Sequence, residues 1–212
     1  MPLELVFIHG WGFDACFWDS LAERLPQFGQ HRVELGFFNE NAATEIPETH
    51  DKILIGHSLG FVHGIKREGW KGWVAINSFG RFVKNDGDGC VSAANLRDMR
   101  LRLQKNADET LRAFYQMLDA KPHADTPNIE RLRYGLDELR DSDVNDIVSS
   151  MNVPGLVLAG GNDPLVPQKI SQKLGSYAEQ FMLNQGGGHL LPQSAPDWCA
   201  SMIVEFIAAN FG

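Results

Sequence analysis

The sequence predicts an α/β fold: an open, mostly parallel sheet of about six strands, with helices on both faces and a helical segment inserted in the chain. Six short runs are rich in apolar and β-branched residues and are near-continuous rather than alternating, which is typical of parallel strands buried on both faces. Helical patterns separate most of these runs, and such alternation implies right-handed crossovers between parallel strands. The expected strands are residues 3–8, 32–35, 52–55, 72–76, 155–159 and 180–183.

Two short sequences predict where helices begin. Ser20-Leu-Ala-Glu23 has the spacing of a capping box, in which a serine and a glutamate three residues later bond to each other's backbone. Ser194-Ala-Pro-Asp197 has the same spacing with aspartate in place of glutamate, and an apolar-periodic stretch follows it. We therefore expect one helix to begin near each of these serines.

The region from Arg81 to about Asn152 interrupts the alternation because it contains no convincing strand. Its apolar residues recur at helical spacing, which predicts two or three amphipathic helices. We expect a helical cap over residues 81–152, inserted in a core formed by residues 1–80 and 153–212.

The charge of the chain restricts its partners. A formal net charge of −8 in 212 residues argues against a general affinity for nucleic acid or for an anionic membrane. Residues 97–140 differ from the rest, because this segment holds nine basic and eight acidic residues. Solvated helices ordinarily interleave charges in this way, and the alternative interpretation is a docking surface for an acidic partner.

The cysteine residues and the hydropathy of the chain indicate the cellular compartment in which the protein is expected. Cys16, Cys90 and Cys199 are odd in number and far apart, so they form neither a disulfide framework nor the close pairs of a zinc site. No apolar run approaches the roughly 20 residues that a membrane span needs. We expect a soluble cytoplasmic protein, a monomer by default.

The stretch from Gly56 to Gly60, Gly-His-Ser-Leu-Gly, matches the G-x-S-x-G pattern and lies between an expected buried strand and an expected helix. A nucleophilic serine raised above the end of a sheet sits on a tight, strained turn where flanking side chains would collide, so glycines belong at both flanking positions. Gly64 is expected to let the following helix pack closely on the sheet. The pattern alone is weak, because a serine after a strand is often only a helix cap.

Serine needs a base to take its proton, an acid to orient that base, and donors for the oxyanion that develops. Asp163 follows one buried strand and His189 follows the next, each at the carboxyl end of the sheet, where open α/β folds place their sites. Taken alone, Asp163 is equally a turn residue beside a proline and His189 a loop histidine after three glycines. The three residues together, in the order Ser58, Asp163, His189, favour a catalytic triad.

The oxyanion donors are expected from His9-Gly10-Trp11-Gly12, at the end of the first strand. Glycines there let backbone N–H groups turn inward, so the N–H groups of Trp11 and Leu59 are candidates for an oxyanion hole. His9 is expected to hold this loop by hydrogen bonds. The chemistry requires no cofactor and no metal ion, and His57 and His63 are not interpreted as metal ligands.

The sequence resembles the α/β-hydrolase superfamily: HGWG after the first strand, GHSLG, GGNDPLVP and GGGHLLP together span nearly the whole chain. Within it, the chain is most similar to the biotin-pathway carboxylesterases that cleave pimeloyl-carrier-protein methyl ester, through its HGWG with tryptophan third, FVKN, YGLDELRDSDV and DPLVPQK. The resemblance implies Ser58 as nucleophile, Asp163 and His189 as the other triad members, Trp11 and Leu59 as the oxyanion hole, and a helical cap over an apolar acyl pocket. The family's usual N-terminal hairpin is expected to be missing, and the stretch ELGFFNENAATEIPETHDKI is short for the family.

We therefore expect a serine carboxylesterase acting on a small-alcohol ester of an acyl chain, such as the methyl ester of a carrier-bound pimeloyl chain. An acidic acyl carrier protein is the expected partner at the basic cap helices, with Arg97, Arg100 and Arg112 as contacts. Two alternatives stay open: a lyase or transferase on the same scaffold, and a small-molecule binding protein that keeps the triad. The residues expected to line the apolar pocket, or to lie in the core, are Phe13, Trp18, Phe79, Phe82, Phe114, Leu190 and Leu191.

Overall fold

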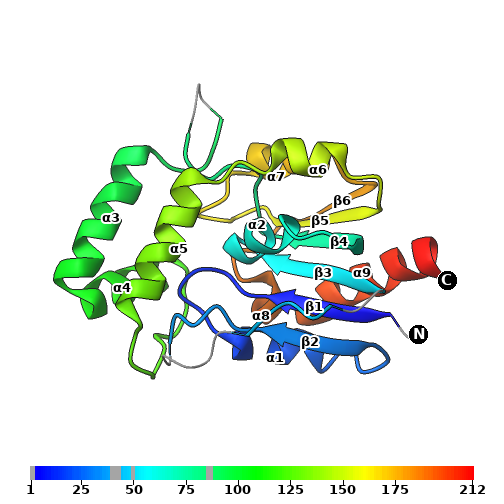
Figure 1. Ribbon diagram of the computed structural model, residues 1–212, viewed down its shortest axis with the longest axis horizontal. Coiled ribbons are helices and arrows are strands. Elements are labelled where there is room, and N and C mark those ends of the chain that lie inside the picture. Colours follow the sequence, from blue (N-terminus) through cyan, green and yellow to red (C-terminus); the bar gives the residue numbers. More distant parts are fainter. Residues whose placement is uncertain (1–2, 39–43, 49–50, 85–87) are drawn as a thin grey trace.

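A computed structural model describes residues 3–38, 44–48, 51–84 and 88–212. In this part of the chain, six strands form one sheet in the order β2-β1-β3-β4-β5-β6, and every neighbouring pair is parallel. The sheet is open, as the sequence predicted, with β2 and β6 at its two edges (Figure 1). The strands are β1 Glu4–Ile8, β2 Gly29–Val33, β3 Lys52–His57, β4 Trp70–Ile76, β5 Gly155–Gly160 and β6 Gln180–Asn184.

Burial along the strands follows their place in the sheet. All residues of β3 and β5 are buried, as are four of the five residues of β1, whereas the edge strands β2 and β6 are mostly half-buried. Helices therefore cover both faces of the central strands, which explains why these strands read as continuous apolar runs.

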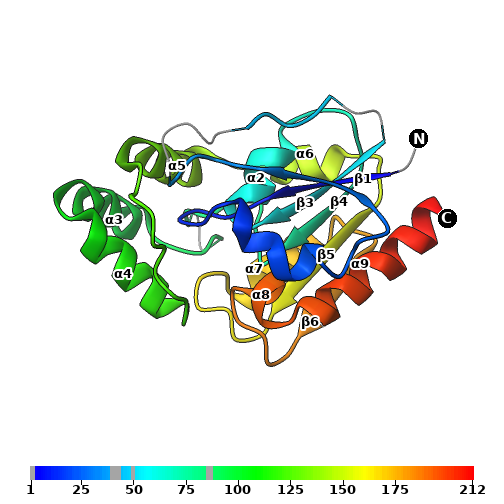
Figure 2. The same ribbon diagram turned by 90° about the horizontal axis from the view of Figure 1, so that it is seen from below.

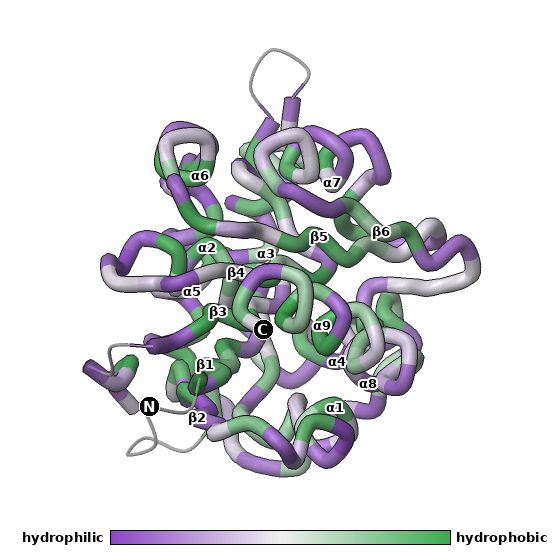
Figure 3. Tube along the Cα trace, turned by 90° about the vertical axis from the view of Figure 1, so that its right-hand side faces the viewer, coloured by the Kyte–Doolittle hydropathy of each residue, from purple (hydrophilic) through white to green (hydrophobic). Residues whose placement is uncertain are grey.

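The helices lie between and after the strands. Ala15–Trp18 is a 3₁₀ helix that runs into α1, and a tube view down the strands shows α1, α8 and α9 on one face of the sheet and α2 on the other (Figure 3). Helix α7 packs against β5 and β6. The helices are α1 Asp19–Ala22, α2 Leu59–Ile65, α3 Ala93–Lys105, α4 Ala107–Met117, α5 Ile129–Asp141, α6 Asn145–Ser150, α7 Gln168–Gly175, α8 Leu191–Ser194 and α9 Pro196–Phe211.

In the described part of the chain between β4 and β5 there are four helices, α3 to α6, where the sequence predicted two or three. Helices α3, α4 and α5 lie beyond the carboxyl ends of the strands, whereas α6 lies beside the sheet near α7 (Figure 1). From here on, "the cap" means α3, α4 and α5 with their connections, residues 92–142. The described ends of the chain lie on the opposite side of the molecule, away from the cap (Figure 2).

The capping residues at the two predicted helix starts need correction. Ser20 lies inside α1, whose N-cap is Trp18, and the capping side chain belongs to Asp14, which accepts from Cys16 N–H at the start of the 3₁₀ helix. Ser194 ends α8, where its hydroxyl donates to the Leu190 carbonyl at 3.0 Å, and α9 begins at Pro196. Both helices therefore begin near the predicted places, but neither serine caps them.

Candidate active site

Ser58 occupies the tight turn between β3 and α2. Its backbone has φ 52° and ψ −122°, a conformation that L residues rarely adopt. A Cβ at Gly56 would lie 2.3 Å from the Phe61 Cα, and one at Gly60 would lie 2.0 Å from the Ile8 carbonyl oxygen. Both flanking glycines are therefore required by close backbone contacts, which is the reason that the sequence suggested for them. A Cβ at Gly64 would also be too close, at 2.6 Å from the Leu54 side chain.

The other two members of the predicted triad meet at the same edge of the sheet. Asp163 follows β5 and His189 follows β6, and the Nδ1–H of His189 donates to Asp163 Oδ2 at 2.8 Å. Both side chains are almost fully buried, at 2% and 1% exposure. Because Nδ1 is engaged by the carboxylate, Nε2 is the nitrogen that remains for a serine hydroxyl.

The carboxylate of Asp163 is held in its charged form. Burial raises its pKa, but the His189 imidazole and the backbone N–H groups of Val166 and Leu165 outweigh that effect, so the pKa lies below its usual value. Leu165 N–H and Val166 N–H donate to Oδ1 at 2.8 and 2.9 Å. Hydrogen bonds to the ionised carboxylate thus offset the cost of burying it.

Two polar residues after β4, which the sequence analysis passed over, also contact this edge. The Asn77 amide donates to Asp163 Oδ2 at 2.9 Å, and the Ser78 hydroxyl donates to the Ser58 carbonyl at 2.8 Å. Both residues are buried. The available signal was a pair of polar residues directly after a buried apolar strand, at the edge where open α/β folds place their sites.

The predicted oxyanion loop runs beside Ser58. A Cβ on Gly10 would lie 3.2 Å from the Ser58 Cβ, so the loop backbone passes close to the serine. Leu59 is the first residue of α2, and the first N–H groups of a helix have no partner within it. The Trp11 N–H has no hydrogen-bond partner among the residues that the structure describes. Both amides are thus available to an oxygen above Ser58.

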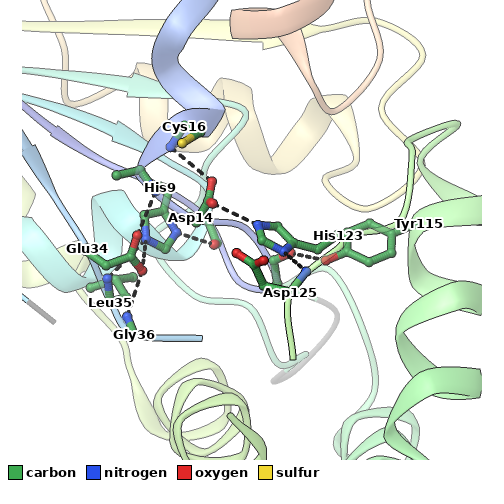
Figure 4. A network of polar contacts seen from close by, with 12 residues as sticks. His9, Asp14, Cys16, Glu34, Leu35, Gly36, Tyr115, His123 and Asp125 are labelled. Carbon is green, nitrogen blue, oxygen red and sulfur yellow. Dashed lines mark hydrogen bonds and ion pairs between the residues drawn. The ribbon is translucent and has the colours of Figure 1, made fainter. Parts of the chain in front are cut away.

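Contacts from the cap and the sheet hold the predicted oxyanion loop, residues 9–12 (Figure 4). The loop is tied to the cap by the Trp11 indole, which donates to the Leu132 carbonyl at 2.8 Å, and by the Tyr115 hydroxyl, which donates to the Gly12 carbonyl at 2.5 Å. His123 and Asp14 form a further contact of 2.8 Å.

On the side of the sheet, His9 lies 3.2 Å from the Glu34 carboxylate, which also accepts from Ala15 N–H at 2.8 Å. Figure 4 shows His9 and Glu34 side by side at the base of the loop. Burial raises the pKa of Glu34, but its bonds to His9, Gly36 and Ala15 lower it overall, so this carboxylate stays ionised. These contacts agree with the structural role expected for His9, which is to hold the loop by hydrogen bonds.

His57 is buried beside the site and stays neutral. Burial, and next the neighbouring His189, lower its pKa well below the ordinary value. Its Nε2–H donates to the His189 carbonyl at 2.9 Å, and its ring stacks on Phe17 with centroids 4.4 Å apart. His57 therefore supports the loop that carries His189.

A largely apolar cavity of about 190 Å³ lies between Ser58 and the cap. Ser58 and His189 both line it, as do Phe82 and Phe114 among the predicted pocket residues. Phe79, Leu190, Phe13, Trp18 and Leu191 are buried in the core and are not among its lining residues. The lining residues are Gly10, Trp11, His57, Ser58, Phe82, Val91, Asn95, Leu96, Met99, Phe114, Met117, Leu136, Leu139, Leu165 and His189.

A second, wider groove of about 690 Å³ runs between α3 and α4. It shares Asn95, Met99, Phe114 and Met117 with the cavity, so the two spaces adjoin. Further along, the lining becomes charged, with Asp98, Arg102, Lys105 and Glu109. The cavity beside Ser58 therefore continues into a space that reaches the surface of the cap.

Metal ligands and membrane spans were also sought in the described ranges. No group of three or more His, Cys, Asp or Glu residues there is arranged to hold a metal ion. Within the same ranges, no helix has the length and apolar character needed to cross a membrane.

A comparison with protein families identifies the fold. Residues 5–202 match the model of the alpha/beta hydrolase family. The chain belongs to the alpha/beta hydrolase family. This hydrolase is also similar to two proteins named pimeloyl-[acyl-carrier protein] methyl ester esterase. The protein from Yersinia enterocolitica is 25% identical, with 96% of this chain and 92% of the relative covered. The protein from Wigglesworthia glossinidia brevipalpis is 27% identical, with 79% and 78% covered.

Solved structures share the fold of this hydrolase at low sequence identity. An esterase from Exiguobacterium antarcticum superposes with a TM-score of 0.81 at 14% identity, covering 98% of this chain and 93% of that one. A bromoperoxidase from Bacillus anthracis gives a TM-score of 0.81 at 13% identity, covering 98% and 92%. Because these two proteins carry names of different reactions, the fold alone does not select the reaction.

Proposed function

We propose that this hydrolase is a serine carboxylesterase that cleaves a small-alcohol ester of an acyl chain through an acyl-enzyme. The observation that carries the proposal is the meeting of Ser58 and His189 in one apolar cavity, with His189 bonded to Asp163 through its far nitrogen at 2.8 Å. The prediction of an ester hydrolase agrees with the family and with the names of the relatives.

In the proposed mechanism, His189 accepts the Ser58 proton through Nε2 while the serine oxygen attacks the ester carbonyl. Asp163 holds the imidazole through Nδ1 and stabilises its cationic form. The N–H groups of Trp11 and Leu59 bind the oxyanion, where fixed donors act most strongly because the site is buried. His189 then protonates the leaving alcohol, and the same histidine activates the water that releases the acid.

The cavity favours an apolar acyl chain over a polar substrate. Its lining is dominated by leucine, methionine, valine and phenylalanine side chains from the cap, from the segment between β4 and the cap, and from the loop after β5. Burying methylene groups against such a surface stabilises a complex by about 0.8 kcal/mol for each group. A methyl ester of a medium-length acyl chain, as in the names of the relatives, suits this site.

Labelled reagents separate the proposed activity from the two alternatives. We expect an organophosphonate to label Ser58 stoichiometrically and p-nitrophenyl butyrate to be turned over many times, with the butyrate carrying one oxygen from labelled water. A transferase or lyase would give a product without solvent oxygen. Slow labelling without turnover would instead indicate a binding protein, and either result would contradict the esterase proposal.

We further propose that the natural ester is presented by an acidic acyl carrier protein at the cap. Arg97 is exposed, its nearest carboxylate being Asp98 at 4.0 Å, and Arg112 is also exposed. Arg100, in contrast, is paired with Asp137 at 2.9 Å and is only 30% exposed, which makes it the weakest of the three predicted contacts. The groove between α3 and α4 would carry the linking arm from the carrier to Ser58.

The carrier proposal is tested with charge-reversal variants. Arg97→Glu and Arg112→Glu together should raise KM for the carrier-linked methyl ester and leave the hydrolysis of p-nitrophenyl butyrate unchanged, because like charges on the rim of an interface disfavour the encounter. Arg67→Glu, an exposed change on the core, is the matched control. Failure of well-expressed wild-type protein to restore growth of a biotin-requiring esterase deletion strain would overturn the carrier proposal while leaving the esterase proposal intact.

A further inference from the structure

Asn77 lies directly after β4 and reaches two loops at once. Its side-chain amide donates to Asp163 Oδ2 at 2.9 Å and to the Gly188 carbonyl at 3.1 Å. Asp163 belongs to the loop after β5, and Gly188 immediately precedes His189 in the loop after β6. One amide group therefore joins the loop of the acid to the loop of the histidine.

The orientation of this amide follows from its partners. A carboxylate oxygen and a carbonyl oxygen both only accept hydrogen bonds, so the NH₂ group and not the oxygen must face them. The Asn77 oxygen is buried and has no partner among the described residues. An unpaired buried oxygen costs free energy, so space filling alone does not account for an asparagine at this position.

The backbone at Asn77 is unusual as well. Its φ is 48°, in the left-handed region that asparagine adopts more readily than most residues. The N–H of Asn77 donates to the Leu158 carbonyl of β5 at 2.8 Å, and only 1% of the residue is exposed. The side chain is therefore aimed from a fixed backbone, and little freedom remains for its amide.

The hydrogen bonds of Asp163 show what the amide adds. Within the described ranges, Oδ1 accepts from two backbone N–H groups, whereas Oδ2 accepts only from the side chains of His189 and Asn77. Without the Asn77 amide, the Oδ2 side of the carboxylate would depend on His189 alone. The backbone bonds to Oδ1 would remain, but the carboxylate and the imidazole would be less restrained against turning together, away from Ser58.

We propose that Asn77 is a positioning residue for the reaction: it clamps Asp163 and the His189 loop so that the imidazole stays aimed at Ser58. Asn77 is absent from the lining of the cavity, so it acts through these two residues and not by touching the acyl chain. The role rests on the proposed esterase activity. Among the described residues, the titratable groups that interact with this pair include the buried Cys90 thiol, whose pKa is raised by burial and then by Asp163, and His57, which lies beside His189.

Three variants test this role with p-nitrophenyl butyrate as the substrate. Asn77→Gly keeps the positive φ accessible and removes the amide, so kcat should fall by about 10- to 100-fold with little change in KM, as expected for a small displacement of a reacting group. Asn77→Asp keeps the shape and replaces the donor with a second carboxyl group. Asn210→Asp, the same change on the exposed end of α9, is the control and should behave as wild type.

The pH profile distinguishes positioning from a merely structural role. Two adjacent carboxyl groups cannot both ionise easily, so at lower pH the new carboxyl of Asn77→Asp is protonated and can donate to Asp163 as the amide does. The activity of Asn77→Asp relative to wild type should therefore rise as pH falls from 8 to 6, whereas the ratio for Asn77→Gly stays flat. The thermal midpoints of all variants are measured alongside.

A readout independent of turnover separates this role from the esterase proposal. The low-field proton resonance of the His189 Nδ1–H reports its bond to Asp163, and we expect it to shift or broaden in Asn77→Gly. If wild type hydrolyses the ester but Asn77→Gly retains its kcat and its resonance, the clamp is wrong and the esterase stands. If wild type hydrolyses no ester but the resonance still changes in the variant, the clamp stands and the reaction is another one.

Discussion

The backbone at Ser58 has a positive φ, and this strain is maintained by packing on both sides of the residue. Gly60 lies directly against the Ile8 carbonyl at the end of β1, and Gly56 lies against the first turn of α2. A side chain at either position would push α2 away from the sheet, and Ser58 is the N-cap of that helix. The placement of the nucleophile therefore depends on two positions that carry no side chain.

Gly60→Ala tests this dependence. Its Cβ would lie 2.0 Å from a backbone oxygen, so we expect the free energy of unfolding to fall by about 1–3 kcal/mol or more, as for other overpacked sites. Gly186→Ala is the matched control, because nothing lies within 4 Å of its Cβ. Chemical denaturation of the two variants measures the difference; equal stabilities would contradict the close-packing argument.

At the scale of single residues, the sequence predicted Ser58, Asp163 and His189, because the spacing of glycines and the ends of strands can be read from short stretches of sequence. It did not predict Asn77, because its partner lies 86 residues away and only the order of the strands brings the two together. Phe79 and Leu190 were chosen for their apolar character, which does not distinguish the core from the lining of a cavity.

Among the elements, the central strands were predicted well, whereas the range predicted for the edge strand β2 was shifted along the chain. Residues 29–32 are Gly-Gln-His-Arg and carry little apolar signal, so the expected strand began at Arg32 whereas β2 spans Gly29–Val33. Other elements cover an edge strand only in part, so its sequence lacks the continuous apolar run that is typical of a strand buried on both faces. The helical spacing of apolar residues predicted the cap helices. It did not predict how many helices there are or which residues cap them, because both depend on local hydrogen bonds.

The oxyanion loop shows how elements far apart in the chain act on one site. Tyr115 of α4 donates to the Gly12 carbonyl, and Trp11 of the loop donates to the Leu132 carbonyl of α5. The cap thus fixes the segment that carries a proposed oxyanion donor. A change in α4 is therefore expected to affect chemistry, and not only substrate binding.

Tyr115→Phe removes the hydroxyl and leaves the Gly12 carbonyl without its donor. We expect the free energy of unfolding to fall by about 1–3 kcal/mol, the cost of an unpaired buried group, and kcat to fall because the loop shifts. Tyr134→Phe, in which the altered side chain is 61% exposed, is the control. A Tyr115→Phe variant with wild-type kcat and stability would show that the loop does not need the cap.

Over the whole molecule, a partly buried carboxylate joins the cap to the core. Glu138 of α5 lies 3.1 Å from His63 Nδ1 and accepts from Lys66 Nζ at 2.9 Å. Burial raises the pKa of Glu138, but His63 and Lys66 lower it overall. A lowered folded pKa means that this carboxylate contributes stability above its unfolded pKa, about 4.3, which is lost as pH falls through the folded pKa.

Glu138→Gln should therefore lower the free energy of unfolding at pH 7 by about 2 kcal/mol, the usual worth of hydrogen bonds to a charged group. The difference from wild type should begin to shrink as pH falls below about 4.3, where the carboxyl group of the unfolded chain takes up its proton. It should vanish only below the lowered folded pKa, where the folded wild-type carboxylate is protonated too. Glu130→Gln removes a surface carboxylate with 83% exposure and should have little effect at any pH. A difference that does not change with pH would contradict the assignment of the contact to the charged form.

The most direct test of the central claim measures kcat/KM for p-nitrophenyl butyrate in Ser58→Ala, His189→Ala and the double variant. Residues that act as one unit lose nearly all activity together, so each single variant should lose on the order of 10⁵- to 10⁶-fold, and the double variant little more. Single variants that keep most of the wild-type activity, or losses that multiply in the double variant, would contradict the proposal that His189, held by Asp163, takes the proton of Ser58 as part of one catalytic unit.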